Sequence, residues 1–244
     1  MNRIVVSNNK VDGIYNNIVN LNESGIYEIV YRDSNDIKIE FNISDSDIII
    51  YESMFDEKIN VNNTYNINNG SLKINKFYAN KEVNEIINVN LLSEGDKFNY
   101  NFSNICNGIE KYIININHNN KKTISNVKNK SIAIKNGDID FIINSSVKKD
   151  CIKSMLDQNT RIVTLDNSKA KVSPNMFIDL DDVVAKHGSV IGVFNEEQIF
   201  YLMSKGISYY DSVKLLVKGY LLSNVDVTME TRIKIMEIID KYWR

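Results

Sequence analysis

Short segments in which Ile, Val, Tyr or Phe alternate with polar residues follow one another from about residue 20 to about residue 190. They are bounded by Asn, Asp, Ser or Gly, and no segment with helical spacing separates them. Such a chain forms β-strands joined by tight turns, which predicts a sandwich, a barrel or a β-helix. The expected strands are residues 26–31, 37–41, 48–51, 72–77, 86–92, 112–116, 132–134, 139–143, 162–165 and 176–180.

Asparagine fills many of the polar positions, with 37 in the 244 residues. Asn tolerates the left-handed backbone conformation of tight turns, and stacked Asn side chains form hydrogen-bonded ladders along a column of strands. A parallel β-helix uses both devices. A bias in codon usage explains the abundance of Asn equally well, so the pattern alone leaves the β-helix and the sandwich open.

The composition is that of an ordinary soluble globular protein, with 43% hydrophobic and 25% charged residues. A formal net charge of −2 gives no support to binding of nucleic acid or of an anionic membrane. Two cysteines exclude a disulfide-rich secreted scaffold, and no run of 18 apolar residues occurs. Because the first 20 residues also lack the pattern of a signal peptide, we expect a cytoplasmic protein.

The character of the chain changes after residue 194, where three helices are expected. Asn195 followed by two glutamates is typical of a helix N-cap, and Gly206 fits the residue that ends this helix. A second helix begins at Ser208, and a third runs from about residue 228 to residue 242. This helical unit is too small to bury much by itself, so it must pack on the β-domain or on a partner.

The segment from residue 174 to residue 222 resembles the SufB/SufD family of iron–sulfur cluster assembly proteins. The family pattern has a Pro, an Asp-Val pair and a His-Gly pair, then an aromatic segment with a Gly-Ile pair, then a helix with a Leu pair and a Gly. The positions that match in order and spacing are Pro174, Asp182, Val183, His187, Gly188, Phe200, Tyr201, Leu202, Ser204, Gly206, Ile207, Leu215, Leu216 and Gly219. A weaker match extends the resemblance back to about residue 118.

The resemblance implies a right-handed parallel β-helix that ends in a small helical domain, which decides between the two folds left open. The chain is then divided into a β-helix core domain of residues 1–194 and a C-terminal helical domain of residues 195–244. The family implies a non-enzymatic scaffold that pairs, as a homo- or heterodimer, with a second SufB/SufD-type subunit through the β-helix ends. It also implies that the helices bind an ABC-type ATPase, SufC, and that an iron–sulfur cluster is held only transiently and shared with the partner.

Some positions depart from the family pattern. SufB-type members carry a cysteine where Asn159 stands, and SufD-type members carry one where Ala185 stands. The His-Gly pair is typical of SufD-type members, so the chain is expected to be SufD-like, in a short form that lacks the family's N-terminal helical region. The alternatives are a degenerate SufD-like paralogue that dimerises without building clusters, and a β-helix carbohydrate-binding module.

Four side chains are weighed as ligands of iron or of a cluster. His187 is the first candidate for a cluster, metal or interface site, because a neutral imidazole ligates iron. Cys151 is the second, since neighbouring lysines favour the thiolate that clusters prefer. Cys106 is expected to be a small buried hydrophobe, and His118, in a turn-like segment, to be solvated. A cluster usually has about four ligands, so the others would come from a partner.

The resemblance implies that the surface that docks the ATPase lies on the C-terminal helices, where Tyr and Met residues suit an interface. The residues assigned to it are Phe200, Tyr201, Lys205, Gly206, Leu215, Leu216, Gly219 and Tyr220. The aspartates at 179, 181 and 182 are expected at a strand end, either as turn residues and ion-pair partners or as ligands of a hard cation. No Walker motif occurs in the chain, so ATP hydrolysis belongs to the partner.

Overall fold

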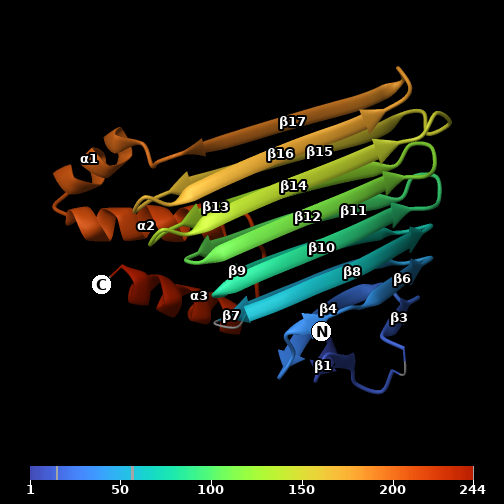
Figure 1. The fold of residues 1–244 in the computed structure, drawn as a ribbon, viewed down its shortest axis with the longest axis horizontal. Helices are drawn as coiled ribbons and strands as arrows, with labels where there is room; N and C mark the ends of the chain where they lie inside the picture. The colour runs from blue at the N-terminus through green and yellow to red at the C-terminus, as the bar shows by residue number, and fades with distance from the viewer. Residues whose placement is uncertain (15, 56–57, 244) are drawn as a thin grey trace.

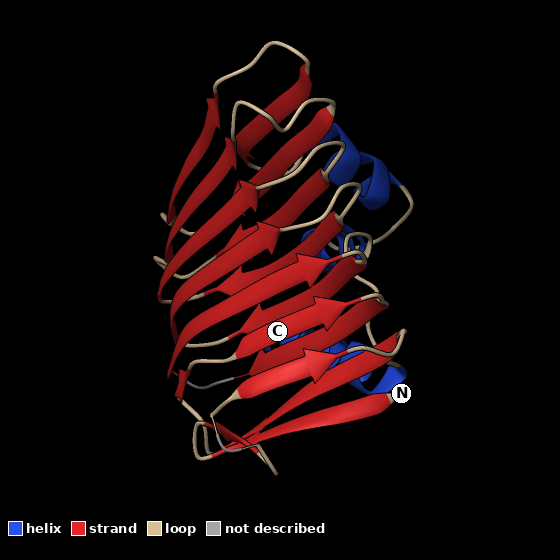
Figure 2. Cartoon of the chain, turned by 90° about the vertical axis from the view of Figure 1, so that its right-hand side faces the viewer, coloured by secondary structure: helices blue, strands red, loops and turns tan. Residues whose placement is uncertain are grey.

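The chain winds into a parallel β-helix of about seven turns, and three helices follow the last strand (Figure 1). The structure, a computed structural model, describes residues 1–14, 16–55 and 58–243. From β6 onward, consecutive strands alternate between two sheets, and each strand from β6 to β15 pairs in parallel with the strand two places further along the chain (Figure 2). The predicted mainly β fold, a parallel β-helix with a small C-terminal helical unit, is confirmed.

Two sheets, called sheet A and sheet B here, form the walls of the solenoid. In spatial order, sheet A contains β17 (Val183–Gly192), β15 (Ser154–Thr164), β13 (Ile124–Ala133), β11 (Lys97–Cys106), β9 (Ser71–Ala79), β7 (Asp47–Phe55), β4 (Gly25–Arg32), β1 (Asn2–Ser7) and β2 (Lys10–Val11). Sheet B contains β16 (Lys169–Ile178), β14 (Asp138–Val147), β12 (Ile109–His118), β10 (Glu82–Leu91), β8 (Lys58–Asn68), β6 (Glu40–Ser44) and β3 (Ile18–Leu21), with β5 (Asp36–Ile37) beside β8. The helices are α1 (Glu196–Ser204), α2 (Tyr209–Leu222) and α3 (Met229–Tyr242).

The strands are longer and more numerous than the alternation of apolar residues predicts. Most of those after residue 57 have about ten residues, and β1, β2, β3, β8, β11 and β17 were not predicted. In β10 the burial alternates along the strand, with apolar side chains and Glu85 inside and Asn or Ile outside. Asn, Lys and Ser at outward positions therefore continue a strand beyond the end that the sequence pattern predicts, because only the inward positions need to be apolar.

Asparagine side chains on the outer face of sheet B form two ladders that cross the turns. The first joins Asn20, Asn42, Asn66, Asn90 and Asn117 by hydrogen bonds of 2.8–3.1 Å. The second joins Asn88, Asn115, Asn144 and Asn175 at 2.8–2.9 Å. Asn also occupies corners of the solenoid, where Asn69, Asn136 and Asn167 have φ values of 59°, 64° and 59°. Both structural uses of Asn predicted from the sequence are therefore confirmed.

Replacing Asn115 by Ala is expected to lower the free energy of unfolding by about 1–2 kcal/mol, because its hydrogen bonds to Asn88 and Asn144 are both lost. Asn84→Ala is the matched control, since Asn84 is an exposed residue of β10 with no side-chain hydrogen bond in the described part of the chain. That change should cost less than about 0.5 kcal/mol. Equal losses for the two variants in urea unfolding would contradict a stabilising ladder.

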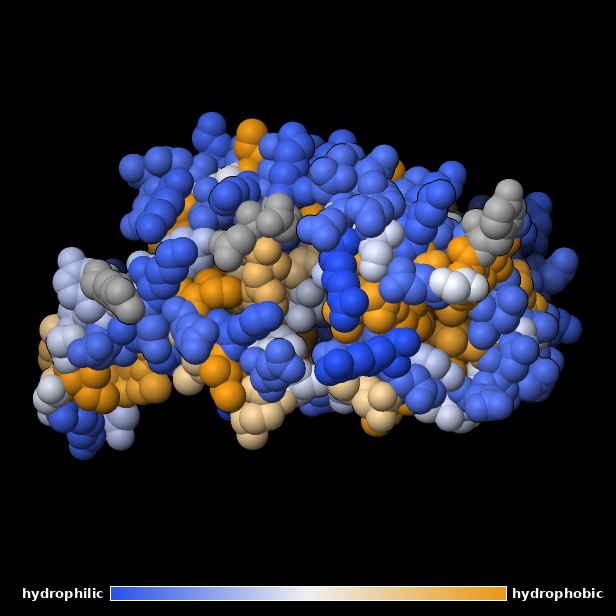
Figure 3. Space-filling model, turned by 90° about the horizontal axis from the view of Figure 1, so that it is seen from below, coloured by the Kyte–Doolittle hydropathy of each residue, from blue (hydrophilic) through white to orange (hydrophobic). Residues whose placement is uncertain are grey.

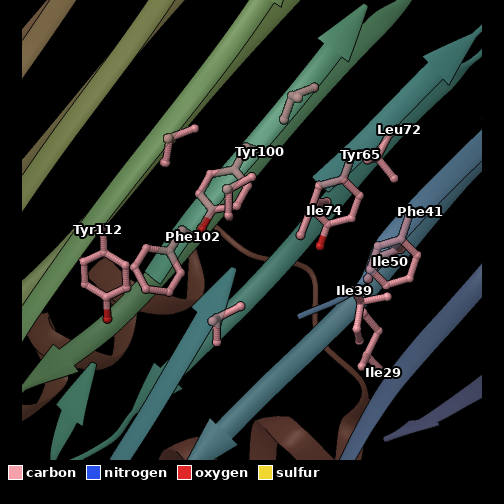
Figure 4. Packing of buried hydrophobic residues seen from close by; sticks show 14 of the residues in the cluster. Ile29, Ile39, Phe41, Ile50, Tyr65, Leu72, Ile74, Tyr100, Phe102 and Tyr112 are labelled. Carbon is pink, nitrogen blue, oxygen red and sulfur yellow. The ribbon is translucent and has the colours of Figure 1, made fainter. Parts of the chain in front are cut away.

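Apolar and aromatic side chains fill the space between the two sheets (Figure 4). Phe41 and Tyr65 stack with their ring centroids 4.9 Å apart, and Phe102 lies 5.0 Å from Tyr112. The turns also stack closely at their corners. A Cβ on Gly108 would lie 2.0 Å from the carbonyl oxygen of Lys81, so only glycine fits there.

The helices cover part of the outer face of sheet A, as Figure 2 shows. Their N-caps are Asn195, Ser208 and Thr228, which confirms the predicted cap at Asn195 and the predicted starts of the second and third helices. Gly206 follows α1 with a φ of 83°, as predicted. One buried cluster joins helices and sheet, and its members include Phe77, Ile105, Ile132 and Val163 of the sheet with Val217, Leu221, Ile235 and Ile239 of the helices. The helical unit therefore contacts β9, β11, β13 and β15 together.

The face seen in Figure 3 is hollowed between the end of β4, the end of β7 and the start of α3, with a volume of about 890 Å³. Charged residues such as Arg3, Arg32, Glu230 and Lys234 line this hollow. Among the described residues, no helix has the length and apolar character needed to cross a membrane.

Candidate functional site

The last turn of the solenoid, formed by β16 and β17, leaves both sheets with an open edge (Figure 1). β17 pairs with β15 and β16 pairs with β14, and no described strand pairs with their other edges. Large apolar side chains are exposed along this end. Their exposed fractions are 60% for Phe177, 48% for Val184, 55% for Val190, 47% for Ile191 and 64% for Val193.

His187 lies in the middle of β17, in register with Gln158 of β15. Paired residues of neighbouring parallel strands point to the same face, and Gln158 is buried inside the solenoid. His187 therefore faces the interior, yet it is exposed because no further described turn covers it. The imidazole is thus presented to whatever covers the open end.

Gln158 is a second candidate at this end, and the sequence analysis did not identify it. Its Nε2 donates to Oγ of Ser145 at 2.8 Å, while its Oε1 is buried without a hydrogen-bond partner in the described part of the chain. An acceptor is therefore left one turn below His187. The sequence could have indicated that Gln158 is buried, because it occupies an inward position in the alternation of β15.

The structure does not bring Cys151 to His187. Cys151 is buried in the loop before β15, where its Sγ donates to the carbonyl oxygen of His118 at 3.2 Å. Cys151 precedes β15, which begins at Ser154, and Ser154 pairs with Val183 at the start of β17. His187 is four residues further along β17, about 13 Å from Val183.

Cys106 is buried at the end of β11, as predicted for a small hydrophobe. Burial raises the pKa of its thiol well above the usual range, and the neighbouring Glu110 carboxyl raises it further. A group held so strongly in the thiol form is a poor thiolate ligand.

The prediction that His118 is solvated is wrong. His118 is fully buried at the end of β12, with Nδ1 2.7 Å from Oγ1 of Thr123 and Nε2 2.9 Å from Oγ of Ser125. Burial lowers the pKa of His118 to about 4, so the ring is neutral at pH 7. The alternation within β12 places this residue inside, and that period outweighs the turn-like sequence that follows it.

No group of three or more His, Cys, Asp or Glu side chains within the described ranges is arranged to hold a metal ion. Asp179, Asp181 and Asp182 lie in and around the loop between β16 and β17, where they are exposed. The backbone carbonyl of Asp182 accepts a hydrogen bond from the amide of Lys153 at 2.6 Å, which is a turn contact.

A second exposed surface lies on α1 and the start of α2. A hollow of about 650 Å³ is lined by Glu196, Glu197, Ile199, Phe200, Tyr201, Met203, Ser204 and Tyr209, and we call this surface the α1 face. Phe200 is 74% exposed and Tyr201 is 61% exposed. The ammonium group of Lys205 lies 5.3 Å from the centre of the Tyr201 ring, which places a cation at the border of the α1 face.

The other residues assigned to docking lie in different surroundings. Gly206 and Gly219 are exposed, and Leu215 is 51% exposed on α2. Leu216 packs against the cluster that joins helices and sheet. Tyr220 is half-buried and donates from its hydroxyl to the carbonyl oxygen of Arg161 at 2.6 Å. Tyr220 therefore fixes α2 to the solenoid. It is not freely exposed, although the sequence analysis assigned it to an exposed docking face.

Two groups of ionisable side chains inside the solenoid were also missed. In the first, the ammonium group of Lys76 lies 2.6 Å from Glu85 and 3.2 Å from Glu52, and all three are fully buried. Tyr78 donates from its hydroxyl to both carboxylates. Burial lowers the pKa of Lys76, but the two carboxylates outweigh this effect, so the net direction is upward and the lysine stays charged.

The second group surrounds Glu110 of β12. Its Oε2 accepts a hydrogen bond from the hydroxyl of Tyr112 at 2.8 Å and another from the amide of Asn104. Burial raises the pKa of Glu110 to about 8, although these hydrogen bonds lower it in part. The sequence indicated this burial, because Glu110 occupies an inward position in the alternation of β12.

Comparisons with known proteins point to one family. The family described as SUF system FeS cluster assembly, SufBD core domain, matches residues 56–220, which is more than half of the chain. The chain is 40% identical over 63 residues to an iron–sulfur cluster assembly SufBD family protein of Mycobacterium leprae, a stretch that covers 25% of this chain and 16% of the relative. It is 32% identical over 99 residues to the iron–sulfur cluster assembly protein SufD of Escherichia coli, covering 41% of this chain and 22% of that protein.

The SufB and SufD proteins of Bacillus subtilis match as well, at 27% identity over 101 residues and 33% over 70 residues. The matched part of the chain spans about a fifth of the length of these relatives. The β-helix, the helices at its end and the match to the core domain agree. The chain belongs to the SufBD family of SUF-system iron–sulfur cluster assembly proteins.

Proposed function

We propose that the chain is a SufD-like scaffold subunit, without catalytic activity of its own, of a cytoplasmic SUF-type iron–sulfur cluster assembly complex. Its open end pairs with a second SufB/SufD-type subunit, and its α1 face binds an ABC-type ATPase of the SufC kind. The observation that carries the proposal is the open end, where an inward-facing His187 and the edges of both sheets stay uncovered by any described residue.

An uncovered strand edge is a template for pairing with another chain. β17 pairs with β15 on one side and offers the free edge of a ten-residue strand on the other, and Val184, Val190 and Ile191 on it are about half exposed. A partner that adds its own edge strand would satisfy these backbone groups and bury the apolar side chains. His187 would then lie at the interface between the two subunits.

The iron–sulfur cluster is cargo in this proposal, held briefly between the subunits. His187 supplies one ligand from this chain, and the remaining ligands come from the partner, since Cys151 and Cys106 are both buried elsewhere. A complex that forms normally but carries no iron in either subunit would favour the alternative, a paralogue that dimerises without building clusters.

Docking of the ATPase is expected to depend on the exposed aromatic residues of the α1 face. Replacing Phe200 and Tyr201 together by Ser should weaken binding of the organism's SufC-type ATPase at least about 100-fold, because aromatic residues near the centre of an interface each contribute about 2 kcal/mol or more. The measurement is anaerobic co-expression followed by size exclusion with light scattering, and titration of the purified components.

Ile109→Ser is the matched control, because Ile109 is 70% exposed but lies at the start of β12, outside the α1 face. It should leave the affinity unchanged. If the wild-type chain remains a monomer and does not bind the ATPase, the docking part of the proposal is wrong. If the ATPase binds both variants equally well, the docking surface lies elsewhere. His187→Ala should lower the iron content of the complex and leave its assembly with the ATPase intact.

A further inference from the structure

Three cations stand together on the outer face of sheet A without a compensating anion among the described residues. Lys128 and Lys130 are outward-facing residues of β13, and Arg161 of β15 is in register with Lys130. None of the three forms an ion pair with a carboxylate in the described part of the chain. Like charges placed opposite each other on neighbouring strands destabilise a sheet. The chain as a whole carries a net charge of −2, so this local excess of positive charge is not imposed by composition.

The end of α2 holds two of these cations in place. Lys130 donates from its ammonium group to Oγ of Ser223 at 2.8 Å and lies 5.3 Å from the centre of the Tyr220 ring. The guanidinium carbon of Arg161 lies 5.7 Å from the centre of the same ring. The guanidinium group itself donates no hydrogen bond to any described residue, so its planar set of donors is free for a ligand.

The spacing of the three groups suits a small anion. Neighbouring strands are about 4.8 Å apart, and side chains two residues apart on one strand are about 6.6 Å apart. The three side chains therefore leave the backbone at the corners of a compact triangle and not along a row that would follow an acidic peptide. Burial lowers the pKa of the half-buried Lys130, and Arg161 and Lys128 lower it further, which is the direction that a bound anion would reverse. The carboxylate nearest in the strand register, Asp157, is paired in register with Lys186.

We propose that Lys128, Lys130 and Arg161 form a binding site for a phosphoryl group. Arg presents two parallel N–H donors that match two oxygens of a phosphate, and the lysines supply point charges. The site stands on the strands of the rigid solenoid, and Tyr220 and Ser223 fix one wall of it. It lies outside the α1 face and on the outer face of sheet A, where Arg161 is in register with Val190 of β17, so it is distinct from the inward-facing His187.

The test is titration of the full chain with inorganic phosphate, at constant ionic strength in chloride, followed by phosphorus NMR line width and by the unfolding temperature. Arg161→Gln and Lys130→Gln should each weaken phosphate binding at least about tenfold. Lys97→Gln is the control, because Lys97 is exposed on the outer face of the same sheet, at the far end of β11 from the helices. It should bind phosphate as the wild type does.

A parallel titration with adenosine monophosphate distinguishes two sources of the same group. Tighter binding of inorganic phosphate indicates a free anion, and tighter binding of the ester indicates a phosphorylated small molecule. Arg161→Gln changes an exposed side chain and should fold normally, which circular dichroism checks. The proposal is wrong if phosphate stabilises the wild type no more than chloride does, or if all three variants bind it equally. Loss of stability in Lys130→Gln without any response of the wild type to phosphate would mean that the cations serve only the negative end of α2.

Discussion

Replacing Lys76 by Met is expected to lower the free energy of unfolding by about 3–5 kcal/mol. Met occupies nearly the same space, but it leaves Glu52 and Glu85 buried without the cation that lies 3.2 Å and 2.6 Å from them. Tyr78 donates hydrogen bonds to both carboxylates but cannot neutralise their charge. The loss should shrink in acid, because the two carboxylates can then take up protons. Urea unfolding at several pH values measures it.

Lys73→Met is the matched control on the same strand. Lys73 pairs with Asp226 at 2.7 Å, but the two side chains are 36% and 65% exposed, so the change should cost less than about 1 kcal/mol. A triple variant that replaces Glu52 and Glu85 by Leu as well as Lys76 by Met should recover much of the loss, because every buried charge is then removed. Equal losses for Lys76→Met and Lys73→Met would show that the buried lysine does not compensate the carboxylates.

Glu110 is expected to lower the stability as the pH rises from about 4.5 to about 8, while the buried His118, whose pKa is lowered from 6.5 to about 4, opposes this effect up to about pH 6.5. Burial raises the pKa of Glu110 from 4.5 to about 8, so in this interval the folded state keeps a proton that the unfolded state has released. Each pH unit then lowers the free energy of unfolding by up to about 1.4 kcal/mol. The whole contribution, about 5 kcal/mol at most, is present below pH 4.5 and is lost as the pH passes 8.

Glu110→Gln tests this assignment directly. The new amide oxygen can still accept from Tyr112 and Asn104, but the side chain no longer titrates, so the alkaline loss of stability should become much smaller. Glu94→Gln is the control: Glu94 is a surface residue whose hydrogen bond from Lys122 lowers its pKa, which gives a small effect of the opposite sign. Thermal unfolding followed across the pH range would contradict the assignment if the Glu110→Gln variant kept the wild-type slope.

The parts of the fold that depend on local chemistry could be predicted from the sequence. Alternation located many of the strands, Asn195 and Gly206 marked the ends of α1, and the uses of Asn in ladders and corners were both found. β8 was missed because its outward residues are mostly Asn, which hides the apolar inward set. The strand partners could not be read from the sequence, because the repeat lengthens from Asp47 with Ser71 to Asp138 with Lys169.

The candidate site could be predicted only in part. His187 was identified by the family resemblance, but its exposure follows from the absence of a described strand beyond β17, which no local pattern contains. Tyr220 has the residue type of an interface, yet the structure places it against Arg161, because α2 must bury one face on the solenoid. The buried charges at Lys76 and Glu110 escaped notice because a charged residue within an alternating segment is normally assigned to the solvent side.

The helical unit changes how a solenoid of this kind shares mechanical load. In a repeat structure each turn normally contacts only its neighbours, so a disturbance fades over a few turns. Here one hydrophobic cluster ties α2 and α3 to Phe77, Ile105, Ile132 and Val163, which belong to four successive strands of sheet A. The helices therefore connect these turns through one shared hydrophobic cluster. A force applied to the helices would be distributed over these four strands together and not over one turn alone.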